Sequence, residues 1–190
     1  MPFGVAPNFI IDGENYTLPM AIEESSVVAA ASKSAKYWSK RGGFHTKIIN
    51  VEKTGHIHFL YDGKKNEIKK FFKNYKKQLI ESCDGISLKM KKRGGGILSM
   101  DLIDKTLDLK NYFQISVCFD TINAMGANFI NSCLEKTAET LKDVFLKSSL
   151  SKKYELEIIM SIMSNYVPNC LVKSWVSCPL KDLNENDGVN

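Results

Sequence analysis

The sequence lacks any apolar run of the roughly 18 to 20 residues that a helix needs to cross a bilayer. Its first residues, Met1-Pro2-Phe3-Gly4, also lack the basic and apolar regions of a signal peptide. We therefore expect a cytoplasmic protein with no membrane partner. Internal repeats are absent as well, and so are low-complexity tracts apart from one lysine cluster, which argues against a repeat architecture.

Disulfide and metal-binding patterns are also missing. The five cysteines are an odd set without a C-x-x-C pair, which predicts reduced thiols rather than a disulfide framework or a zinc ribbon. His56 and His58 share one face of a predicted strand, but a third ligand is not evident, so we predict no metal site. The cysteines are Cys83, Cys118, Cys133, Cys170 and Cys178.

The composition is that of a globular protein, with 44% hydrophobic and 25% charged residues among 190 and a net charge of +5. The positive excess is largely local and is typical of a solvated helix face. Attraction of a phosphate-rich cofactor is a second interpretation, and charge alone does not separate the two. Nucleic-acid binding is a third, but stacking aromatics and a known motif are missing, so we predict no nucleic-acid partner. The clustered residues are Lys64, Lys65, Lys69, Lys70, Lys73, Lys76 and Lys77.

The N-terminal part predicts a hairpin followed by a helix. Residues 9–11 and 16–18 are apolar stretches separated by Asp12-Gly13, a turn signal. Serine then precedes an alanine-rich run, and Gly42-Gly43 supplies a stop, which predicts a helix over residues 26–40. Because its residues are small, a neighbouring helix or a ligand can approach this helix closely.

The rest of the chain alternates two-residue and 3.6-residue periods of apolar residues. From residue 55 to residue 163 the predicted order is β-α-β-β-α-β, the split pattern of ferredoxin-like folds, so we expect an α+β protein. One predicted helix follows Asp62-Gly63, a second spans residues 124–147, and residues 181–190 are predicted to form a polar, frayed tail. The predicted strands are 44–51, 55–61, 97–103, 112–120, 154–163 and 171–178.

The first candidate for chemistry is Glu24, which comes immediately before the alanine-rich helix. A carboxylate at this position normally accepts hydrogen bonds from free helix N–H groups and stays ionised. Alternatively, apolar neighbours such as Met20, Ile22 and Val27 enclose it, raise its pKa and make it a proton donor.

The second candidate is the segment Asn123-Ala124-Met125-Gly126-Ala127-Asn128, between a strand and a long helix. Free N–H groups at the start of a helix bind anions, and small residues let a diphosphate come close, although small residues also occur there for packing. The segment is not G-x-G-x-x-G, and the surrounding order is not that of a Rossmann fold. Met163-Ser164-Asn165 at the end of an apolar strand is a third candidate, or simply a turn.

Together these segments resemble successive motifs of class II, bacterial-type hydroxymethylglutaryl-coenzyme A (HMG-CoA) reductases. The resemblance runs from residue 2 to about residue 175, and the glutamate and A-M-G-A-N motifs are specific as a pair. The matching segments are Pro2-x-Gly4-Val5-Ala6, Pro19-Met20-Ala21-x-Glu23-Glu24-x-Ser26 with Val27-Val28-Ala29-Ala30-Ala31-Ser32, Gly42-Gly43-Phe44, Ala124-Met125-Gly126-Ala127-Asn128 and Met163-Ser164-Asn165.

The resemblance implies an activity: two hydride transfers from NAD(P)H reduce HMG-CoA, through a hemithioacetal and mevaldehyde, to mevalonate and coenzyme A. It implies that Glu24 is the catalytic acid, that Ser26 contacts the HMG group and that Asn165 lies near the reacting centre. Met125, Gly126, Ala127 and Asn128 would lie along the dinucleotide. It also implies a homodimer or higher homo-oligomer with active sites between subunits.

Two departures from the family concern the cofactor. The family motif usually begins with aspartate where this chain has Asn123. In NADH-using relatives an acidic residue holds the ribose hydroxyl, whereas the nearest match here is Ser99, with Lys92 and Arg93 close by. Because cations favour a 2′-phosphate, these residues favour NADPH slightly, and both NADPH and NADH stay open as cofactors.

The resemblance also divides the chain. We expect residues 1–43 to be part of the large, HMG-CoA-binding α/β domain, residues 44–165 to be an inserted NAD(P)-binding domain, and residues 166–190 to return to the large domain and end in the tail. The family's catalytic lysine, aspartate and histidine lie beyond the matched region, so we expect this polypeptide alone to have little reductase activity.

The alternative to a reductase is a binding or regulatory module with the fold but without the chemistry. A ferredoxin-like RNA-binding module would need exposed aromatics on its central strands, and residues 115–119 lack the basic-glycine-aromatic start of that pattern. A module that binds cofactor without catalysis stays open from the residues alone.

Overall fold

The computed structural model of the chain describes residues 2–21 and 23–183, which form two compact units. Unit 1 comprises Met1–Ile49 and Leu171–Asn190, and unit 2 comprises Asn50–Cys170. Strand β3 (His45–Tyr61) pairs with β7 (Cys170–Trp175), and both strands run across the unit boundaries.

Unit 1 contains the expected hairpin and helix. Strand β1 (Phe3–Ile11) pairs antiparallel with β2 (Glu14–Ala21), and the turn residues Asp12 and Gly13 have φ values of 50° and 88°. Two consecutive positive φ angles are those of the hairpin turn that Asp-Gly favours, so the hairpin prediction is confirmed. Helix α1 (Ser25–Ser39) follows and confirms the predicted helix within one residue at each end.

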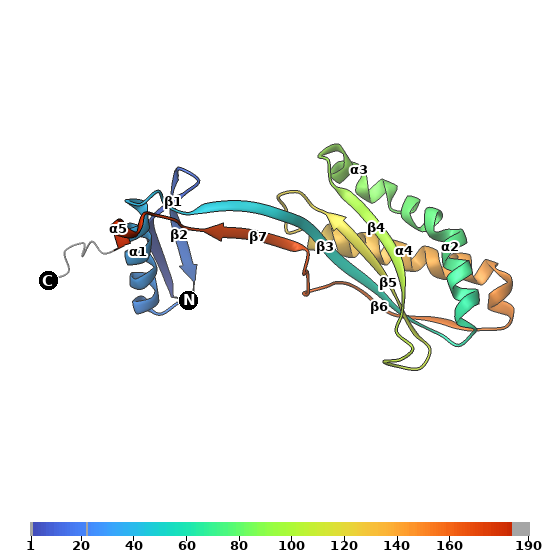
Figure 1. Cartoon of the computed structure of the whole chain (residues 1–190). Helices are drawn as coiled ribbons and strands as arrows, with labels where there is room; N and C mark the ends of the chain where they lie inside the picture. The colour runs from blue at the N-terminus through green and yellow to red at the C-terminus, as the bar shows by residue number, and fades with distance from the viewer. Residues whose placement is uncertain (1, 22, 184–190) are drawn as a thin grey trace. The chain divides into compact units, whose positions relative to one another are not determined.

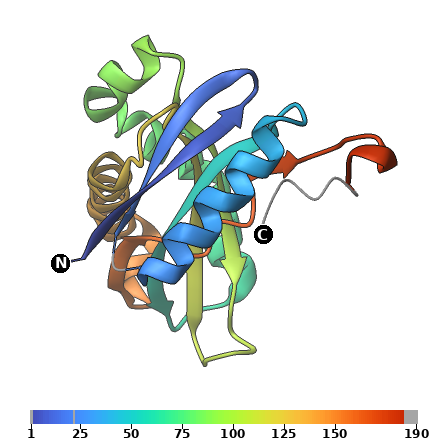
Figure 2. The same ribbon diagram turned by 90° about the vertical axis from the view of Figure 1, so that its left-hand side faces the viewer.

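Small residues let α1 lie close to the hairpin in unit 1 (Figure 2). A Cβ atom on Gly4 would lie 2.9 Å from Cγ2 of Val28, and Ala6 and Ala35 are fully buried. The short helix α5 (Leu180–Leu183) lies where the sequence predicts a frayed tail, because Arg41 Nε donates to the carbonyl of Asp182 over 2.9 Å and anchors it. Residues 184–190 of that predicted tail lie outside the described residues.

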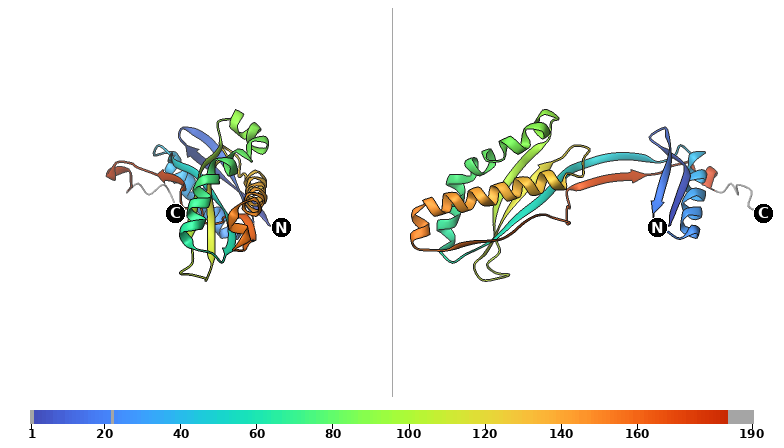
Figure 3. Two further views of the ribbon diagram at one scale, coloured as in Figure 1. Left: turned by 90° about the vertical axis from the view of Figure 1, so that its right-hand side faces the viewer. Right: turned by 180° about the vertical axis from the view of Figure 1, so that it is seen from behind.

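Unit 2 has one antiparallel sheet with the strand order β4-β5-β3-β6. The strands that complete it are β4 (Gly96–Asp104), β5 (Tyr112–Asp120) and β6 (Leu156–Met163). Helices α2 (Lys65–Glu81) and α4 (Ala127–Lys147) cover one face of this sheet (Figures 1 and 3). The order confirms the expected α+β class with a ferredoxin-like β-α-β-β-α-β unit.

The core of unit 2 follows from the strand alternation. Ile57 and Phe59 of β3 and Phe113 and Ile115 of β5 are buried under the helices, while the residues between them lie half-buried on the other face. Each helix presents one apolar stripe to these residues, as the 3.6-residue period predicts. The close approach of α4 explains Gly55, where a Cβ atom would lie 2.5 Å from Cδ1 of Leu134.

Unit 2 differs from the sequence prediction in three places. The helix predicted over residues 124–147 begins later, at Ala127, because Gly126 before it has a positive φ. Strand β3 is continuous where two strands are expected, because Glu52, Lys53 and Thr54 keep their pairing with β5 through the polar stretch. Helix α3 (Asp84–Lys92) follows α2 and was not predicted, because only Ser87 and Met90 of its residues are buried and its apolar stripe is short. Among the described residues, no helix is both long and apolar enough to cross a membrane.

Candidate functional site

The turn from β5 into α4 contains most of the predicted cofactor residues, and its own side chains shape it. Thr121 is fully buried, and its hydroxyl donates to the carbonyl of Ala124 over 2.6 Å. The carboxylate of Asp120 accepts from the backbone N–H of Ile122 over 2.7 Å. Ile122 has a positive φ of 55°, which this hydrogen bond stabilises. The turn is therefore held by local bonds at both ends.

Gly126 is the residue at which the turn becomes a helix. It has a φ of 84°, and a Cβ atom there would lie 2.4 Å from Cγ2 of Thr121, so both backbone geometry and space require glycine. No side chain caps the first N–H groups of α4, and its first turn contains no acidic residue. Uncapped N–H groups and the positive end of the helix dipole together make an anion-binding position.

A lysine from the neighbouring strand supports this turn. Lys53 of β3 donates from Nζ to the hydroxyl of Thr121 over 2.6 Å and to the carbonyl of Ala124 over 2.8 Å. The motifs in the sequence do not point to Lys53. One feature of the sequence could have indicated it. Lys53 alternates with Gly55 and Ile57 and so lies on the same face of the strand, which the helices cover. A cation on that face needs a polar partner.

The glycine-rich turn before β4 lies against the same segment. A Cβ atom on Gly95 would lie 2.6 Å from the carbonyl oxygen of Asp120 and 3.2 Å from a side-chain carbon of Ile122. Gly96 pairs with Asp120 in the sheet. Residues 94–96 and 120–126, which are far apart in the sequence, thus form one surface at this end of unit 2.

A cavity of about 300 Å³ opens between α3 and the start of α4. Its two basic residues, Lys89 and Arg93, take part in no ion pair between described residues. Asn128 of the predicted motif lines the same cavity, whereas Met125 is largely exposed at the turn. The cavity is lined by Ile86, Lys89, Met90, Arg93, Asn128, Phe129 and Ser132.

Asn165 lies at the same end of unit 2 as the motif. It follows β6, whose last residue Met163 donates its N–H to Oδ1 of Asn131 on α4 over 2.9 Å. The N–H of Ser164 donates to the carbonyl of Thr54 on β3 over 2.8 Å. The exposed Asn165 therefore follows β6 at the same end of the sheet at which β5 leads into the turn before α4.

Glu24 and Ser26 lie in unit 1, at the start of α1, and both side chains are exposed. Glu24 occupies the N-cap position, and its carbonyl accepts from the N–H groups of Val27 and Val28 over 3.0 and 3.2 Å. Its carboxylate makes no capping hydrogen bond, so the capping interpretation is wrong. Val27 beside it is 43% exposed, and Ile22, another of the expected apolar neighbours, lies outside the described residues.

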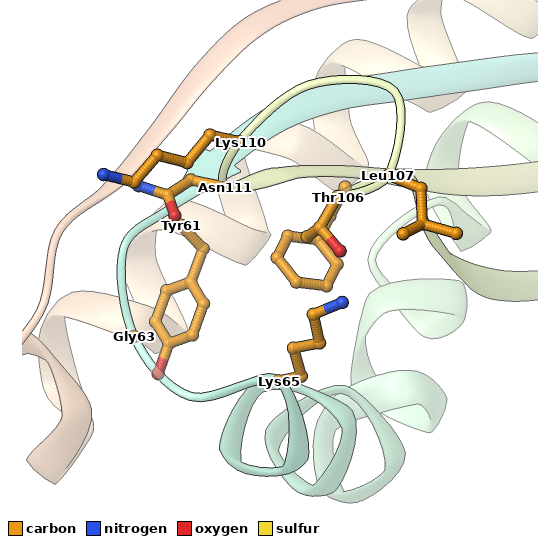
Figure 4. Close-up of a pocket in the computed structure, with 8 residues that line it drawn as sticks. Tyr61, Gly63, Lys65, Thr106, Leu107, Lys110 and Asn111 are labelled. Carbon is orange, nitrogen blue, oxygen red and sulfur yellow. The ribbon is translucent and has the colours of Figure 1, made fainter.

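A second cavity, of about 320 Å³, lies at the opposite end of the unit 2 sheet, near the C-terminal end of β3 (Figure 4). None of the predicted site residues lines it. Its Lys65 pairs with Asp104 at 3.3 Å, and burial together with the nearby Glu67 carboxylate raises the pKa of Tyr61 to about 12. Two lysines, Lys65 and Lys110, line this cavity, but α2, which begins beside it, has the acidic Glu67 in its first turn, whereas the first turn of α4 has no acidic residue. The start of α4 therefore suits an anion better.

His56 and His58 lie on the face of the sheet away from the helices. Nδ1 of His58 and the hydroxyl of Tyr112 are 2.6 Å apart, and the ring of His56 lies 5.7 Å from that of His58. Burial lowers the pKa of both imidazoles, and for His56 the charges of His58 and Lys105 lower it further. Within the described residues, no three His, Cys, Asp or Glu side chains are grouped so that they could hold a metal ion.

Fold and site define an α+β protein with a ferredoxin-like unit. In this unit a glycine precedes the N-terminus of α4, and a cavity with two basic residues adjoins it. The family model described as hydroxymethylglutaryl-coenzyme A reductase matches residues 1–188. The chain belongs to this family, which confirms the resemblance seen in the sequence.

Individual relatives agree with the family match. The chain is 33% identical over 164 residues to the 3-hydroxy-3-methylglutaryl-coenzyme A reductase of Archaeoglobus fulgidus, covering 85% of this chain and 36% of that protein. It is 27% identical over 185 residues to the probable reductase of Borreliella burgdorferi, covering 96% and 39%. The chain thus spans less than half the length of these relatives.

A solved structure has the same fold. The class II 3-hydroxy-3-methylglutaryl-CoA reductase of Streptococcus pneumoniae, bound to NADPH in open conformations, superimposes with a TM-score of 0.72 at 28% identity. The match covers 91% of this chain and 44% of that one.

Proposed function

We propose that this chain supplies the NAD(P)H-binding unit and the catalytic acid of an HMG-CoA reductase, which reduces HMG-CoA to mevalonate and coenzyme A. The observation that carries the proposal is the start of α4, where uncapped N–H groups, Gly126 and a basic cavity occur together. Family membership supplies the reaction, and the local geometry supplies a position for the cofactor.

The described residues fit a dinucleotide. The N–H groups of Ala127 and Asn128 would receive the diphosphate, with Met125 and Gly126 along it, and the bound cofactor would supply hydride. Lys89 and Arg93 give the adjoining cavity a positive charge, which favours a ligand with an additional phosphate. We therefore propose NADPH rather than NADH. The similar structure bound to NADPH supports the same choice.

The remaining roles belong to the substrate side. We propose that Glu24 protonates the developing alkoxide, that Ser26 contacts the HMG group and that Asn165 lies near the reacting carbon. Glu24 needs a neutral carboxyl for this role, and its exposure in unit 1 means that the apolar surroundings must come from bound substrate or a neighbouring subunit. We also propose a homodimer or higher homo-oligomer with HMG-CoA as ligand, as the family resemblance implies, and a cytoplasmic location.

Calorimetric titration of the 190-residue chain with NADPH and NADH tests the cofactor assignment. We expect wild-type protein to bind both, and Arg93→Met to weaken NADPH binding roughly tenfold while leaving NADH binding nearly unchanged, because only NADPH carries the 2′-phosphate. Lys73→Met on the exposed face of α2 is the matched control, since it removes one positive charge at a residue that does not line the cavity.

The outcomes separate three possibilities. Binding of neither dinucleotide at millimolar concentration contradicts the function itself. Equal loss of both dinucleotides in Arg93→Met contradicts the 2′-phosphate preference but leaves cofactor binding in place. An effect of Lys73→Met as large as that of Arg93→Met means that net charge, rather than the cavity, governs the affinity.

A further inference from the structure

Lys53 occupies an unusual position for a lysine. It lies within β3, paired with Phe119 of β5, and is half-buried on the side of the sheet that α4 covers. Its ammonium group donates to two acceptors in the turn before α4, the hydroxyl of Thr121 and the carbonyl of Ala124. The hydroxyl in turn donates to the same carbonyl, so the three groups form a closed network under the turn.

The positive charge of Lys53 is not matched by a carboxylate. None of the ion pairs between described residues involves it. The two nearest acids along the strands are engaged elsewhere: Glu52 accepts from the side chain of Asn169 over 3.0 Å, and Asp120 accepts from the N–H of Ile122. A half-buried cation with neutral acceptors lies at the base of a helix start that itself attracts anions.

We propose that Lys53 is a positioning residue for the cofactor: it fixes the turn at Thr121 and Ala124 so that the first N–H groups of α4 converge on one anion. Its charge adds to the positive potential of the helix start. This inference rests on the proposed function, because the anion in question is the diphosphate of the dinucleotide.

The network explains why the turn can hold its shape without a side-chain cap on α4. Thr121 is buried, and its methyl group leaves room only for a glycine at position 126. Lys53 holds the hydroxyl of that threonine and the carbonyl of Ala124 at the same time. Loss of the ammonium would leave both acceptors with one donor fewer and free the turn to shift relative to α4.

Two measurements on the full chain test the proposal, using Lys53→Met and Thr121→Val to remove the network, Thr121→Ser to keep its hydroxyl, and Lys73→Met as the charge control. We expect Lys53→Met and Thr121→Val each to weaken NADPH binding roughly tenfold or more, because a hydrogen bond to a charged group is lost. Thr121→Ser and Lys73→Met should remain close to wild type.

Amide hydrogen exchange without cofactor provides the second measurement. In Lys53→Met, exchange should accelerate at the N–H of Ala124, which donates to Thr121, and of Ile130, which donates to Gly126, while the β3–β5 ladder stays protected. Unchanged NADPH affinity and unchanged exchange in both Lys53→Met and Thr121→Val would overturn the inference. If wild-type protein fails to bind NADPH, the proposed function fails, and the exchange result still decides whether Lys53 fixes the turn.

Discussion

The two units of this chain are built on different principles. In unit 2, large side chains from the sheet and from α2 and α4 form a continuous core, and Phe59, Phe113 and Leu134 are almost completely buried. In unit 1, the fully buried apolar residues among those described are Ala6 and Ala35, and α1 approaches the hairpin over Gly4. Unit 2 is held by apolar area, and unit 1 by close backbone approach and hydrogen bonds.

This difference assigns the two units different tasks. Unit 2 can hold the turn and the start of α4 in a fixed geometry, because its core supports both elements that flank the site. Unit 1 carries Glu24 and Ser26 on an exposed helix start, where small residues leave space for a large ligand or another protein surface. Under the proposed function, the start of α4 is a preorganised position for the cofactor, whereas the roles proposed for Glu24 and Ser26 depend on what covers α1.

The largest effect should come from the core of unit 2. Replacing the buried Leu134 by alanine should lower the free energy of unfolding by about 2 to 5 kcal/mol, because it leaves a cavity between α4 and β3. Leu146→Ala on the same helix, where the side chain is 61% exposed, should cost no more than about 0.5 kcal/mol. Urea unfolding measures both. Equal costs would mean that unit 2 does not depend on this core.

The core of unit 2 was predictable because its periodicity is strong. Alternation in residues 112–120 gave β5 with its final bounds, and the apolar stripe of the long helix gave the C-terminal end of α4. Helix α3 was not predicted, since a short helix with two buried residues shows no clear periodicity of apolar residues. The continuity of β3 was not predicted for a different reason. Pairing with β5 keeps the strand intact through polar residues that, from the sequence alone, indicate a break between two strands.

The candidate site was predictable where it depends on backbone conformation and not where it depends on distant contacts. Gly126 lies in the motif that the sequence singles out, and its positive φ and its close approach to Thr121 explain why that position is glycine. Lys53 is 71 residues from Ala124 in the chain, and only the folded sheet brings them together. The exposure of Glu24 likewise depends on which surfaces surround α1, which local sequence does not specify.

A smaller effect should follow in unit 1, from Gly4→Ala. The new Cβ would lie 2.9 Å from Val28, which forces α1 away from β1 and should cost about 1 to 3 kcal/mol. In the double variant Gly4→Ala with Val28→Ala, the shortened side chain makes room, so the combined cost should be less than the sum of the single costs. Hydrogen exchange of α1 measures the change. Additive costs would show that the two residues do not press against each other.

The smallest effect should be a pH dependence confined to unit 2. Burial lowers the pKa values of His56 and His58 below the ordinary 6.5 in the folded state, so below that pH the unfolded chain binds more protons than the folded one. The stability of unit 2 should therefore fall as the pH drops through about 6.5 and level off below the folded pKa values. In unit 1, hydrogen bonds from Thr46 lower the pKa of Asp12 from 3.8, so its contribution is lost only in stronger acid.

Because the histidines of unit 2 and Asp12 of unit 1 gain protons in different pH ranges, one experiment can distinguish the responses of the two units. As the pH falls from about 7.5 to about 5, the protection factors of amides in β3 and β5, which correct for the intrinsic pH dependence of exchange, should decrease, while those at the β1–β2 turn stay constant. Replacing both His56 and His58 by glutamine should flatten the response of unit 2, because neither position then gains a proton. Asp12→Asn should leave this range unchanged. A response that survives the double histidine replacement would mean that other groups, and not the half-buried imidazoles, couple unit 2 to protons.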